Sequence, residues 1–336
     1  MGVFVIAEAG VNHNGSLETA KRLVDAAVEA KADAVKFQTF RAESLVCRDA
    51  PKAEYPKRDG EVESQYEMLK SLELSLEAFR ALKCYCDESG ILFLSTPFDE
   101  RSAEFLVRDL GMERVKIGSG EITNLPFLEF VAGLGRPVIL STGMSFLEEV
   151  RQAVETMRGV SPEIRLTLLH CTTSYPCPFE EVNLNAMRTL RETFRVPVGY
   201  SDHTLGIEIA VAAAALGAEV IEKHFTLDRR MGGPDHAASL EPDKLRQMVL
   251  SIRNVERSMG DGRKEPTSSE EKNKVVVRKS LVSARGLKRG SLLREGDIVI
   301  KRPAGGIPPS ELQKVIGRTL RVDKGVDELL TWQDVQ

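Results

Sequence analysis

The hydrophobic positions of this chain fall into short runs rich in β-branched residues, which alternate with longer stretches whose apolar residues recur at helical spacing. Such alternation is typical of repeated strand–helix units that build a parallel sheet. Helices are predicted, among others, over residues 16–30, 76–89, 146–157 and 206–216. The predicted strands cover residues 3–8, 34–39, 91–97, 114–118, 137–142, 166–171, 196–201 and 220–226. The pattern therefore predicts eight strand–helix units in series.

Such units can close into a (β/α)8 barrel or lie side by side in an open, doubly wound sheet. An open sheet that binds dinucleotides carries Gly-x-Gly-x-x-Gly after its first strand, whereas this first strand leads into Asn12-His13-Asn14-Gly15. We therefore predict an α/β fold in which residues 1–258 form a TIM-barrel catalytic domain. The longest connection, 41–65, is charged and rich in turn formers, as expected of an active-site loop or a surface excursion.

The pattern changes near residue 259. Residues 260–274, GDGRKEPTSSEEKNK, are polar and charged, contain Gly, Pro and Ser, and offer nothing to bury, so we predict a linker over 259–277. Short β-type runs follow, namely SLVSAR, DIVIKRP and RTLRV, separated by Gly and Pro turns. They are too few for a large sheet, and residues 278–336 are predicted to form a small all-β domain.

Composition narrows the class of protein. The 336 residues are 42% hydrophobic and 29% charged, which is typical of a globular protein. Because 46 Lys and Arg nearly balance 50 Asp and Glu, the chain has no overall positive field to hold a nucleic acid. We expect no nucleic-acid partner, and an anionic substrate would need a local cluster of cations.

Cysteine usage and the first residues bear on location. The five cysteines are an odd number without zinc-ribbon spacing, in a chain large enough to need no disulfides. We expect reduced, structural thiols and a cytoplasmic protein. The first apolar run has no basic residues before it and reaches Glu8 after seven residues, so we expect neither a signal peptide nor a membrane partner.

Polar side chains gather where the predicted strands end. In a barrel these carboxyl ends meet at one mouth, which is where active sites form. A single polar residue at a strand end is usually a cap or a turn former. Several charged residues at one mouth are different, because unpaired charges are costly to bury. The residues concerned include Glu8, Lys36, Gln38, Thr96, Lys116, Ser119, Glu121, Ser141, His170, Thr173, Tyr175, Ser201, His203, Glu222 and His224.

All five histidines fall on or just after predicted strand ends. His203 and His224 come from neighbouring strands and are candidate ligands of a divalent metal ion, with water and substrate oxygens completing the coordination. The alternative for each is a buried histidine that hydrogen-bonds to backbone.

Lysines and hydroxyls at the mouth suit a small phosphate ester. Lys36 and Lys116 supply charge, and the hydroxyls of Thr96, Ser119, Ser141 and Ser201 supply donors. Alternatively, one lysine forms a Schiff base, as in barrel aldolases. In the second domain, Arg302 lies on a Gly-rich turn from which it can reach an acidic or hydroxylated substrate.

Several motifs, read in order, resemble the sialic acid synthase family. The tail from residue 278, with IKRPAGGI, is similar to the antifreeze-like SAF domain, of β-clip type, that ends these synthases. In the barrel the resemblance is carried by IAEAGVNHNG (6–15), VKFQT (35–39), FLSTPF (93–98), KIGSGE (116–121), ILSTGM (139–144), LLHCTTSYP (168–176), GYSDHT (199–204), EKHFT (222–226) and GPDH (233–236).

The resemblance implies a reaction between phosphoenolpyruvate and the aldehyde of an open-chain N-acyl hexosamine such as N-acetylmannosamine, giving a nine-carbon 2-keto acid and phosphate. It implies a divalent ion, Mn²⁺ before Mg²⁺ or Co²⁺, on His203 and His224, with Glu8 acting on the water that attacks C2. Residues implied to hold phosphoenolpyruvate are Lys36, Thr96, Lys116, Ser119, Ser141, Thr173 and Ser201. Those implied to lie near the sugar are Gln38, Glu121, Tyr175, Asp235 and Arg302.

The family's SAF domain delivers its arginine to the barrel of a partner subunit, so the resemblance implies a domain-swapped homodimer. Several N-acetylneuraminate synthases carry Lys where this chain has Ala237, and a legionaminate or pseudaminate synthase acting on a diacetamido-dideoxy hexose fits nearly as well. A Schiff-base pyruvate aldolase and a non-catalytic sugar-binding protein remain as alternatives.

Overall fold

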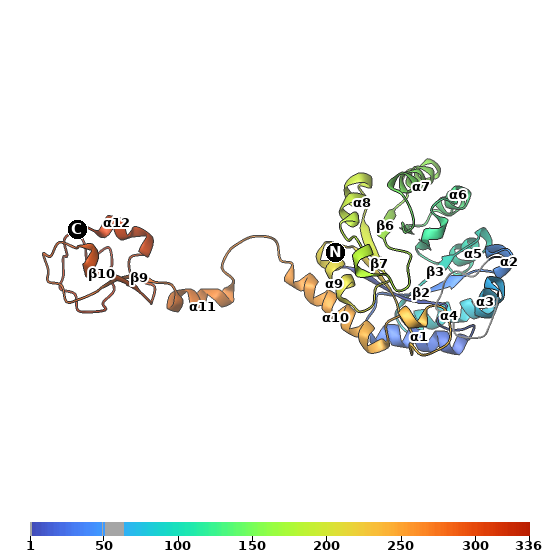
Figure 1. Cartoon of the computed structure of the whole chain (residues 1–336), viewed down its shortest axis with the longest axis horizontal. Helices are drawn as coiled ribbons and strands as arrows, with labels where there is room; N and C mark the ends of the chain where they lie inside the picture. The colour runs from blue at the N-terminus through green and yellow to red at the C-terminus, as the bar shows by residue number, and fades with distance from the viewer. Residues whose placement is uncertain (1, 49, 51–63) are drawn as a thin grey trace. The chain divides into compact units, whose positions relative to one another are not determined.

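The computed structural model describes residues 2–48, 50 and 64–336. The chain divides into two compact units, Met1–Gly260 and Asp261–Gln336, and each is described by itself. Figure 1 shows the strands of the first unit enclosed by helices.

Eight parallel strands form the first unit, with the order β3-β2-β1-β8-β7-β6-β5-β4. Strands β3 and β4, at the two ends of this order, pack against each other, so the sheet curls into a near-closed barrel. The predicted TIM-barrel fold is confirmed. The strands are β1 (Phe4–Gly10), β2 (Ala34–Thr39), β3 (Leu92–Pro97), β4 (Val115–Ile117), β5 (Val138–Ser141), β6 (Leu166–His170), β7 (Val198–Asp202) and β8 (Val220–His224).

The helices around the strands begin where the sequence offers capping side chains. The hydroxyls of Ser16 and Ser75 accept hydrogen bonds from the first turns of α1 and α4, and a cap of this kind satisfies a backbone N–H that lacks a partner. The helices of this unit are α1 (Leu17–Glu29), α2 (Ala42–Leu45), α3 (Gln65–Leu72), α4 (Leu76–Glu88), α5 (Glu100–Glu104), α6 (Leu125–Gly133), α7 (Leu147–Val160), α8 (Ala186–Phe194), α9 (Glu208–Ala215) and α10 (Pro242–Ser258).

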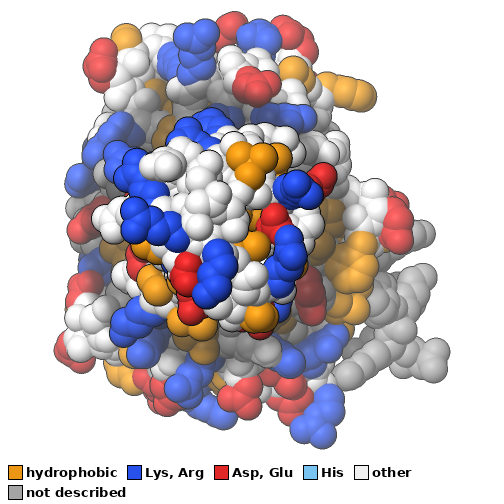
Figure 2. Space-filling view, turned by 90° about the vertical axis from the view of Figure 1, so that its left-hand side faces the viewer, with side chains coloured by type: hydrophobic (Ala, Val, Ile, Leu, Met, Phe, Trp, Pro, Cys, Tyr) orange, Lys and Arg blue, Asp and Glu red, His pale blue; other side chains and the backbone are white. Residues whose placement is uncertain are grey.

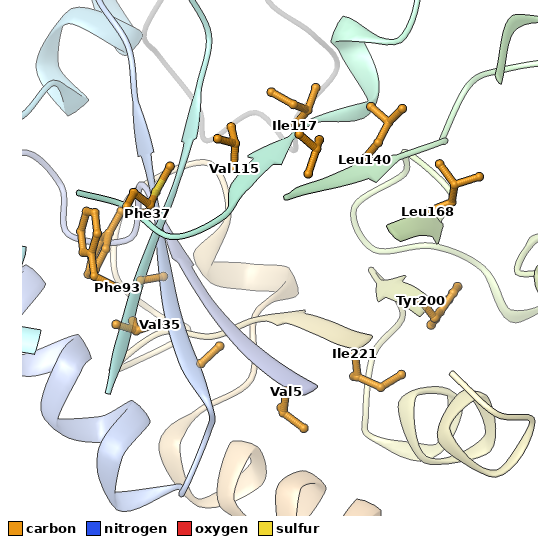
Figure 3. Packing of buried hydrophobic residues seen from close by; sticks show 14 of the residues in the cluster. Val5, Val35, Phe37, Phe93, Val115, Ile117, Leu140, Leu168, Tyr200 and Ile221 are labelled. Atoms are coloured by element: carbon orange, nitrogen blue, oxygen red, sulfur yellow. The ribbon is translucent and has the colours of Figure 1, made fainter. Parts of the chain in front are cut away.

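The strands bury both faces, because successive side chains point in opposite directions. Outward-facing residues such as Val5, Val35, Phe93 and Ile221 pack into the main core under the helices, as Figure 3 shows. The inward-facing residues nearer the amino ends of the strands form a second apolar cluster inside the barrel. That cluster contains Ile6, Ala34, Leu94, Ile139, Leu169 and Val220, and it leaves only the opposite end of the interior open to polar side chains.

The connection predicted at 41–65 contains α2 and leads into α3, whose first residue is Gln65. Its central part, 51–63, lies outside the described residues. Among the residues that the structure describes, no helix is both long and apolar enough to cross a membrane.

The second unit begins with a helix where the sequence predicted only a linker. Helix α11 (Ser268–Val277) starts at Thr267, whose hydroxyl accepts from the Glu270 N–H while the Glu270 carboxylate accepts from the Thr267 N–H. This capping box was present in the sequence. The helix nevertheless buries no residue, and its three valines, Val275 to Val277, are exposed.

The rest of the second unit is a small β-rich domain. Strands β9 (Ser280–Ser283) and β10 (Ile298–Lys301) pair antiparallel, and α12 (Leu312–Val315) follows. The third predicted run, RTLRV, forms only isolated pairs, Leu292 with Thr319 and Leu320 with Val335. The unit has its own apolar core, which includes Leu281, Leu293, Ile307, Val315 and Leu330.

Candidate active site

A cavity of about 270 Å³ opens at the carboxyl ends of the barrel strands. Most of the residues predicted for the site line it, from every strand of the barrel or from the segment just after it. They are Glu8, Lys36, Gln38, Thr96, Lys116, Ser119, Ser141, Thr173, Tyr175, Ser201, His203, His224 and Asp235. The topology thus brings together side chains that are up to 227 positions apart in the sequence, as the separation from Glu8 to Asp235 illustrates.

Strand periodicity explains which side chains reach the cavity. Two positions beyond each residue of the inner apolar cluster, the side chain again points inward. From Ile6, Ala34, Leu94, Ile139, Leu169 and Val220 this rule leads to Glu8, Lys36, Thr96, Ser141, Cys171 and Glu222, all of which line the cavity. The apolar layer therefore forms the floor of a polar pocket.

Two predicted residues are not part of this lining. The Glu121 carboxylate accepts a hydrogen bond of 2.7 Å from the Asn124 amide, at the turn after β4. Arg302 is exposed on the second unit. The roles predicted for both residues stay predictions.

Four buried charges alternate in sign across the floor of the pocket. Lys36 Nζ lies 2.8 Å from the Glu8 carboxylate and 3.7 Å from that of Glu222. Lys116 Nζ lies 3.5 Å from Glu222 on its other side. The side chains of all four residues are at most 5% exposed. Buried charges are costly unless they are paired in this way. Both lysines also line the cavity, where an anion could bind to them.

The two carboxyl groups differ in protonation. Burial prevails at Glu8 over the attraction of Lys36 and raises its pKa to about 7. Burial also acts on Glu222, but Lys116 and Lys36 outweigh it and hold the pKa at about 2. Glu222 is therefore a fixed anion at neutral pH, whereas Glu8 exchanges its proton there, as suits a general acid or base.

The pKa values of Lys36 and Lys116 also shift in opposite directions. Burial disfavours the charged form of each, but Glu222 and Glu8 keep the pKa of Lys36 above its usual value. The pKa of Lys116 falls below its usual value, because burial is opposed there mainly by Glu222 alone.

Hydroxyl groups complete the polar floor. Lys116 Nζ donates to Ser141 Oγ at 2.7 Å, and Lys36 Nζ donates to Thr96 Oγ1 at 3.1 Å. Ser201 Oγ donates to Glu222 at 3.0 Å. Two cations surrounded by hydroxyls offer the charge and the donors that a phosphate or carboxylate requires.

Further polar side chains surround Gly143, at the turn after β5. Ser119 Oγ accepts from the Gly143 N–H at 2.9 Å and contacts Cys171 Sγ at 3.2 Å. A Cβ atom on Gly143 would lie only 2.4 Å from Thr173 Oγ1. Glycine is therefore required here for the backbone N–H to sit among these side chains.

Two histidine rings lie next to each other, edge to face, at the side of the pocket. The ring centroids of His203 and His224 are 5.6 Å apart, and the Tyr175 ring lies 4.1 Å from His203 and 5.5 Å from His224. The Nδ1 of His203 donates to the Thr172 carbonyl at 2.6 Å in the tautomer that keeps Nε2 unprotonated. A backbone carbonyl that fixes the tautomer in this way is common behind metal-binding histidines.

The two histidines fit a divalent metal ion by their chemistry. Burial lowers the pKa of His203 to about 4 and lowers that of His224 well below its usual value, so both rings are neutral, as a ligand must be. His224 Nδ1 is buried and makes no hydrogen bond, with Asp235 Oδ2 3.5 Å away. Within the described ranges, no group of three or more His, Cys, Asp and Glu side chains is arranged to hold a metal, so substrate or water would supply the remaining ligands.

The other three histidines lie outside the cavity lining. His170 Nε2 bonds to the Val182 carbonyl at 2.7 Å, and His13 Nδ1 accepts from the Gly15 N–H at 3.0 Å. His236 lies between Thr226 Oγ1 at 2.6 Å and Asn14 Oδ1 at 3.2 Å. The alternative of a buried histidine that bonds within the protein therefore applies to these three.

Gly10 holds three site residues close together. Its φ of +52° suits glycine. A Cβ atom there would lie 3.2 Å from Glu8 Oε1, 3.3 Å from Gln38 Nε2 and 3.5 Å from Asp235 Oδ2. Gln38 Nε2 also donates to Glu8 at 3.2 Å. Gly10 thus allows Asp235, from the loop after β8, to approach Glu8.

Replacement of Gly10 by alanine is therefore expected to lower kcat/KM by on the order of 10- to 100-fold, because a methyl group displaces Glu8 and Gln38 from their positions. The matched control is Gly111→Ala, since Gly111 also has a positive φ, of +66°, but a Cβ atom there would meet no other atom within 4 Å. Both variants should lose similar stability, and steady-state kinetics with thermal melts separate the two effects. Equal activity of the two variants would contradict this role for Gly10.

Several cavity residues have no role predicted from the sequence. Glu222 lies near the end of its strand but carries no predicted function, although its position two residues after Val220 already points it inward. Cys171 was predicted to be structural only. One wall of the cavity is apolar and consists of Val11, Met68, Leu69, Leu72 and Phe98. Three of these residues lie on α3, beyond the long connection, so strand-end reasoning had no signal for them.

Comparison with known proteins agrees with this geometry. Residues 23–264 match the NeuB family and residues 278–336 match the SAF domain. The chain is 48% identical to the N,N'-diacetyllegionaminic acid synthase of Legionella pneumophila, over all of this chain and 95% of that protein. It is also 48% identical to the N,N'-diacetyllegionaminic acid synthase of Campylobacter jejuni, over 97% of this chain and 98% of that protein.

Among solved structures, the fold is similar to the N-acetylneuraminic acid synthetase of Leptospira borgpetersenii. The TM-score is 0.72 at 38% identity, and the match covers 81% of this chain and 90% of that one. The resemblance predicted from the motifs is therefore confirmed. This chain belongs to the NeuB family of sialic acid and legionaminic acid synthases, and it ends in a SAF domain.

Proposed function

We propose that this protein condenses phosphoenolpyruvate with the open-chain aldehyde of an acylated amino sugar. C3 of phosphoenolpyruvate bonds to the aldehyde carbon, whose oxygen gains a proton. Water adds to C2, and phosphate leaves by cleavage of its C–O bond, which yields a nine-carbon 2-keto acid. The observation that carries the proposal is the pair of buried lysines beside two neutral histidines at the barrel mouth.

Phosphoenolpyruvate would lie over the floor of the pocket. Its phosphate and carboxylate need at least two cations, and Lys36 and Lys116 are both buried there with hydroxyl neighbours. Their existing partners, Glu8 and Glu222, offset the positive charge of the two lysines. An incoming anion therefore gains charge-assisted hydrogen bonds without meeting a fully desolvated, unpaired cation.

Glu8 is the group that we assign to the water at C2. Its raised pKa, about 7, lets it take a proton from water and release it at neutral pH. Gln38, which donates to Glu8 at 3.2 Å, orients the carboxylate. Glu222, which keeps its charge, instead holds both lysines in place.

His203 and His224 would hold a divalent cation, with Mn²⁺ as the ion we propose first and Mg²⁺ or Co²⁺ as substitutes. Such an ion acts as a Lewis acid that polarises the aldehyde oxygen. The protein's part is to keep both rings neutral by burial and to fix the His203 tautomer through the Thr172 carbonyl. Tyr175 packs against both rings and restricts their rotation.

For the sugar we propose a diacetamido hexose that leads to a legionaminic-type acid. The apolar wall formed by Val11, Met68, Leu69, Leu72 and Phe98 suits acyl methyl groups better than it suits free hydroxyls. The 48% identity to legionaminic acid synthases points the same way. N-acetylmannosamine is the second candidate, because a structural relative at 38% identity is an N-acetylneuraminic acid synthetase.

We further propose a homodimer in which the second unit of one copy reaches the barrel mouth of the other and supplies Arg302. Residues 261–336 contain 16 Lys and Arg against 11 Asp and Glu, although the whole chain is net negative. Figure 2 shows Lys and Arg side chains spread over the face in view, with Asp and Glu side chains among them. Opposite net charges of the two units favour such docking.

The five free cysteines fit a reducing cytoplasm, which is the location we propose.

A single incubation series tests the function. The purified protein, phosphoenolpyruvate and Mn²⁺ are combined with a panel of N-acyl and diacetamido hexoses, and phosphate release and product mass are measured. We expect a nine-carbon product, with kcat/KM for the diacetamido sugar about tenfold or more above that for N-acetylmannosamine. EDTA should stop phosphate release and added Mn²⁺ should restore it. No product from any sugar would contradict the proposal.

A Schiff-base aldolase would behave differently. Lys116, with its lowered pKa, is the lysine such an enzyme would use. Borohydride would then trap pyruvate on the protein, and EDTA would have no effect. A non-catalytic sugar-binding protein would retain its binding after both His203 and His224 are replaced.

A further inference from the structure

The two candidate metal ligands are flanked by a buried ion pair on the opposite face of their strands. In the register of β7 and β8, Asp202 is paired with Lys223, and Ser201 is paired with Glu222. Since side chains alternate, Ser201 and Glu222 point into the cavity, and Asp202 and Lys223 point toward the outer helices. Neither Asp202 nor Lys223 is more than 1% exposed. The pair has no part in the function described so far.

Its hydrogen bonds enclose the turn that carries His203. Lys223 Nζ lies 2.7 Å from Asp202 Oδ2 and donates to the Thr204 carbonyl at 2.5 Å. Asp202 Oδ1 accepts from the Thr204 N–H at 2.9 Å and from its hydroxyl at 2.8 Å. The residues on both sides of His203 are thereby fixed to each other and to β8. Lys223 is also the residue immediately before His224.

We propose that Asp202 and Lys223 are positioning residues that set the separation and orientation of the His203 and His224 rings for metal binding. The inference rests on the proposed function, because it concerns the cation assigned to those rings. Outer groups that orient metal ligands typically change metal affinity by 10- to 100-fold when they are replaced.

The ion pair between Asp202 and Lys223 is not expected to add much to the stability of the fold. A fully buried ion pair roughly balances its desolvation cost against its attraction, and well-packed apolar residues often do as well. Its hydrogen bonds do, however, fix the backbone next to His203. The three groups of Thr204 that bond to the pair lie one residue beyond His203, and the His203 carbonyl accepts from the Cys177 N–H at 2.8 Å. Loss of the pair would leave the backbone of His203 anchored through the Cys177 N–H alone of these contacts, while the ring would keep its hydrogen bond to the Thr172 carbonyl.

The test measures Mn²⁺ binding to the full-length protein without substrates, by isothermal titration and by the electron paramagnetic resonance of bound Mn²⁺. The variant Asp202→Asn/Lys223→Met removes both charges together, so that no unpaired charge stays buried. We expect its Kd for Mn²⁺ to rise about 10- to 100-fold. Its thermal melting point should change by only a few degrees.

The matched control is Asp33→Asn/Arg253→Met, which removes the ion pair of 2.6 Å between Asp33, just before β2, and Arg253 of α10. We expect its Kd for Mn²⁺ to stay within about twofold of the wild-type value, because neither Asp33 nor Arg253 lines the cavity that contains His203 and His224. An unchanged Kd in the Asp202/Lys223 variant would overturn the inference, and so would equal weakening in the control.

A milder variant guards against misfolding. Thr204→Val keeps the shape of the side chain but removes the hydroxyl that donates to Asp202, and we expect a rise in Kd of about threefold to tenfold. A wild-type Kd in this variant, if the double variant does not fold, would overturn the inference. Failure of the wild-type protein itself to bind Mn²⁺ would instead refute the proposed metal site, and this inference with it.

Discussion

Replacement of His203 by alanine is expected to abolish measurable Mn²⁺ binding and to lower kcat/KM by on the order of 1,000-fold or more. A Lewis acid contributes several kcal/mol to such a reaction, and each 1.4 kcal/mol is about a factor of ten. The ring of His203 makes one backbone hydrogen bond, to Thr172. The fold should therefore survive, which circular dichroism and thermal melts would show.

The matched control is His170→Gln. His170 ends the neighbouring strand β6, and its ring bonds to the Val182 carbonyl outside the cavity lining. Glutamine retains a donor near that carbonyl, so we expect kcat/KM within a few-fold of the wild-type value. A His203→Ala variant that binds Mn²⁺ and turns over like the control would refute the proposed metal site.

Replacement of Glu8 by glutamine is expected to lower kcat by about 100- to 10,000-fold, the usual contribution of a general base. Metal binding should be unaffected, because Glu8 is not one of the proposed ligands. The neutral amide resembles the protonated form of Glu8, which is well populated near pH 7. We therefore expect little loss of stability at that pH, in contrast to the removal of a permanently charged partner.

The pH dependence gives Glu8 a second signature. If its carboxylate form takes the proton from water, kcat/KM of the wild type should rise with pH through a limb near pH 7. Because folding raises this pKa, the protonated form favours the native state. Stability should accordingly fall as pH rises from the ordinary Glu pKa, about 4.5, to about 7. The Glu8→Gln variant should lack that loss. Parallel pH profiles of stability in both proteins would refute the assignment.

Much of the fold was predictable from local pattern. The predicted strand at 34–39 coincides with β2 (Ala34–Thr39), and the others differ from the observed strands by a few positions at their ends. Strand ends are difficult to predict because local hydrophobic pattern specifies the boundaries of an element less well than its existence. Helix α11 was missed because its first seven residues are polar and its apolar residues, Val275 to Val277, show no helical spacing, although Thr267 and Glu270 carried the signal of a capping box.

The site was predictable where it follows the strands. Residues such as Lys36 and Ser141 could be placed because they lie on strands with their side chains directed inward, and parallel strands of a barrel open at one mouth. Glu121 also follows a strand, yet the turn after β4 directs its carboxylate to Asn124. The direction of a side chain in a turn depends on backbone angles that strand alternation does not specify.

The sequence by itself determined the order of the elements and which residues face inward, because strand periodicity is a local property of the chain. Only the tertiary structure decided which inward-facing groups interact and how strongly they are charged. Glu8 and Glu222 are the same residue type at equivalent strand ends, but their pKa values lie near 7 and 2 because each has different buried neighbours. Electrostatic energy in a dry interior depends on distances of a few ångströms between residues far apart in sequence, and closure of the barrel sets those distances.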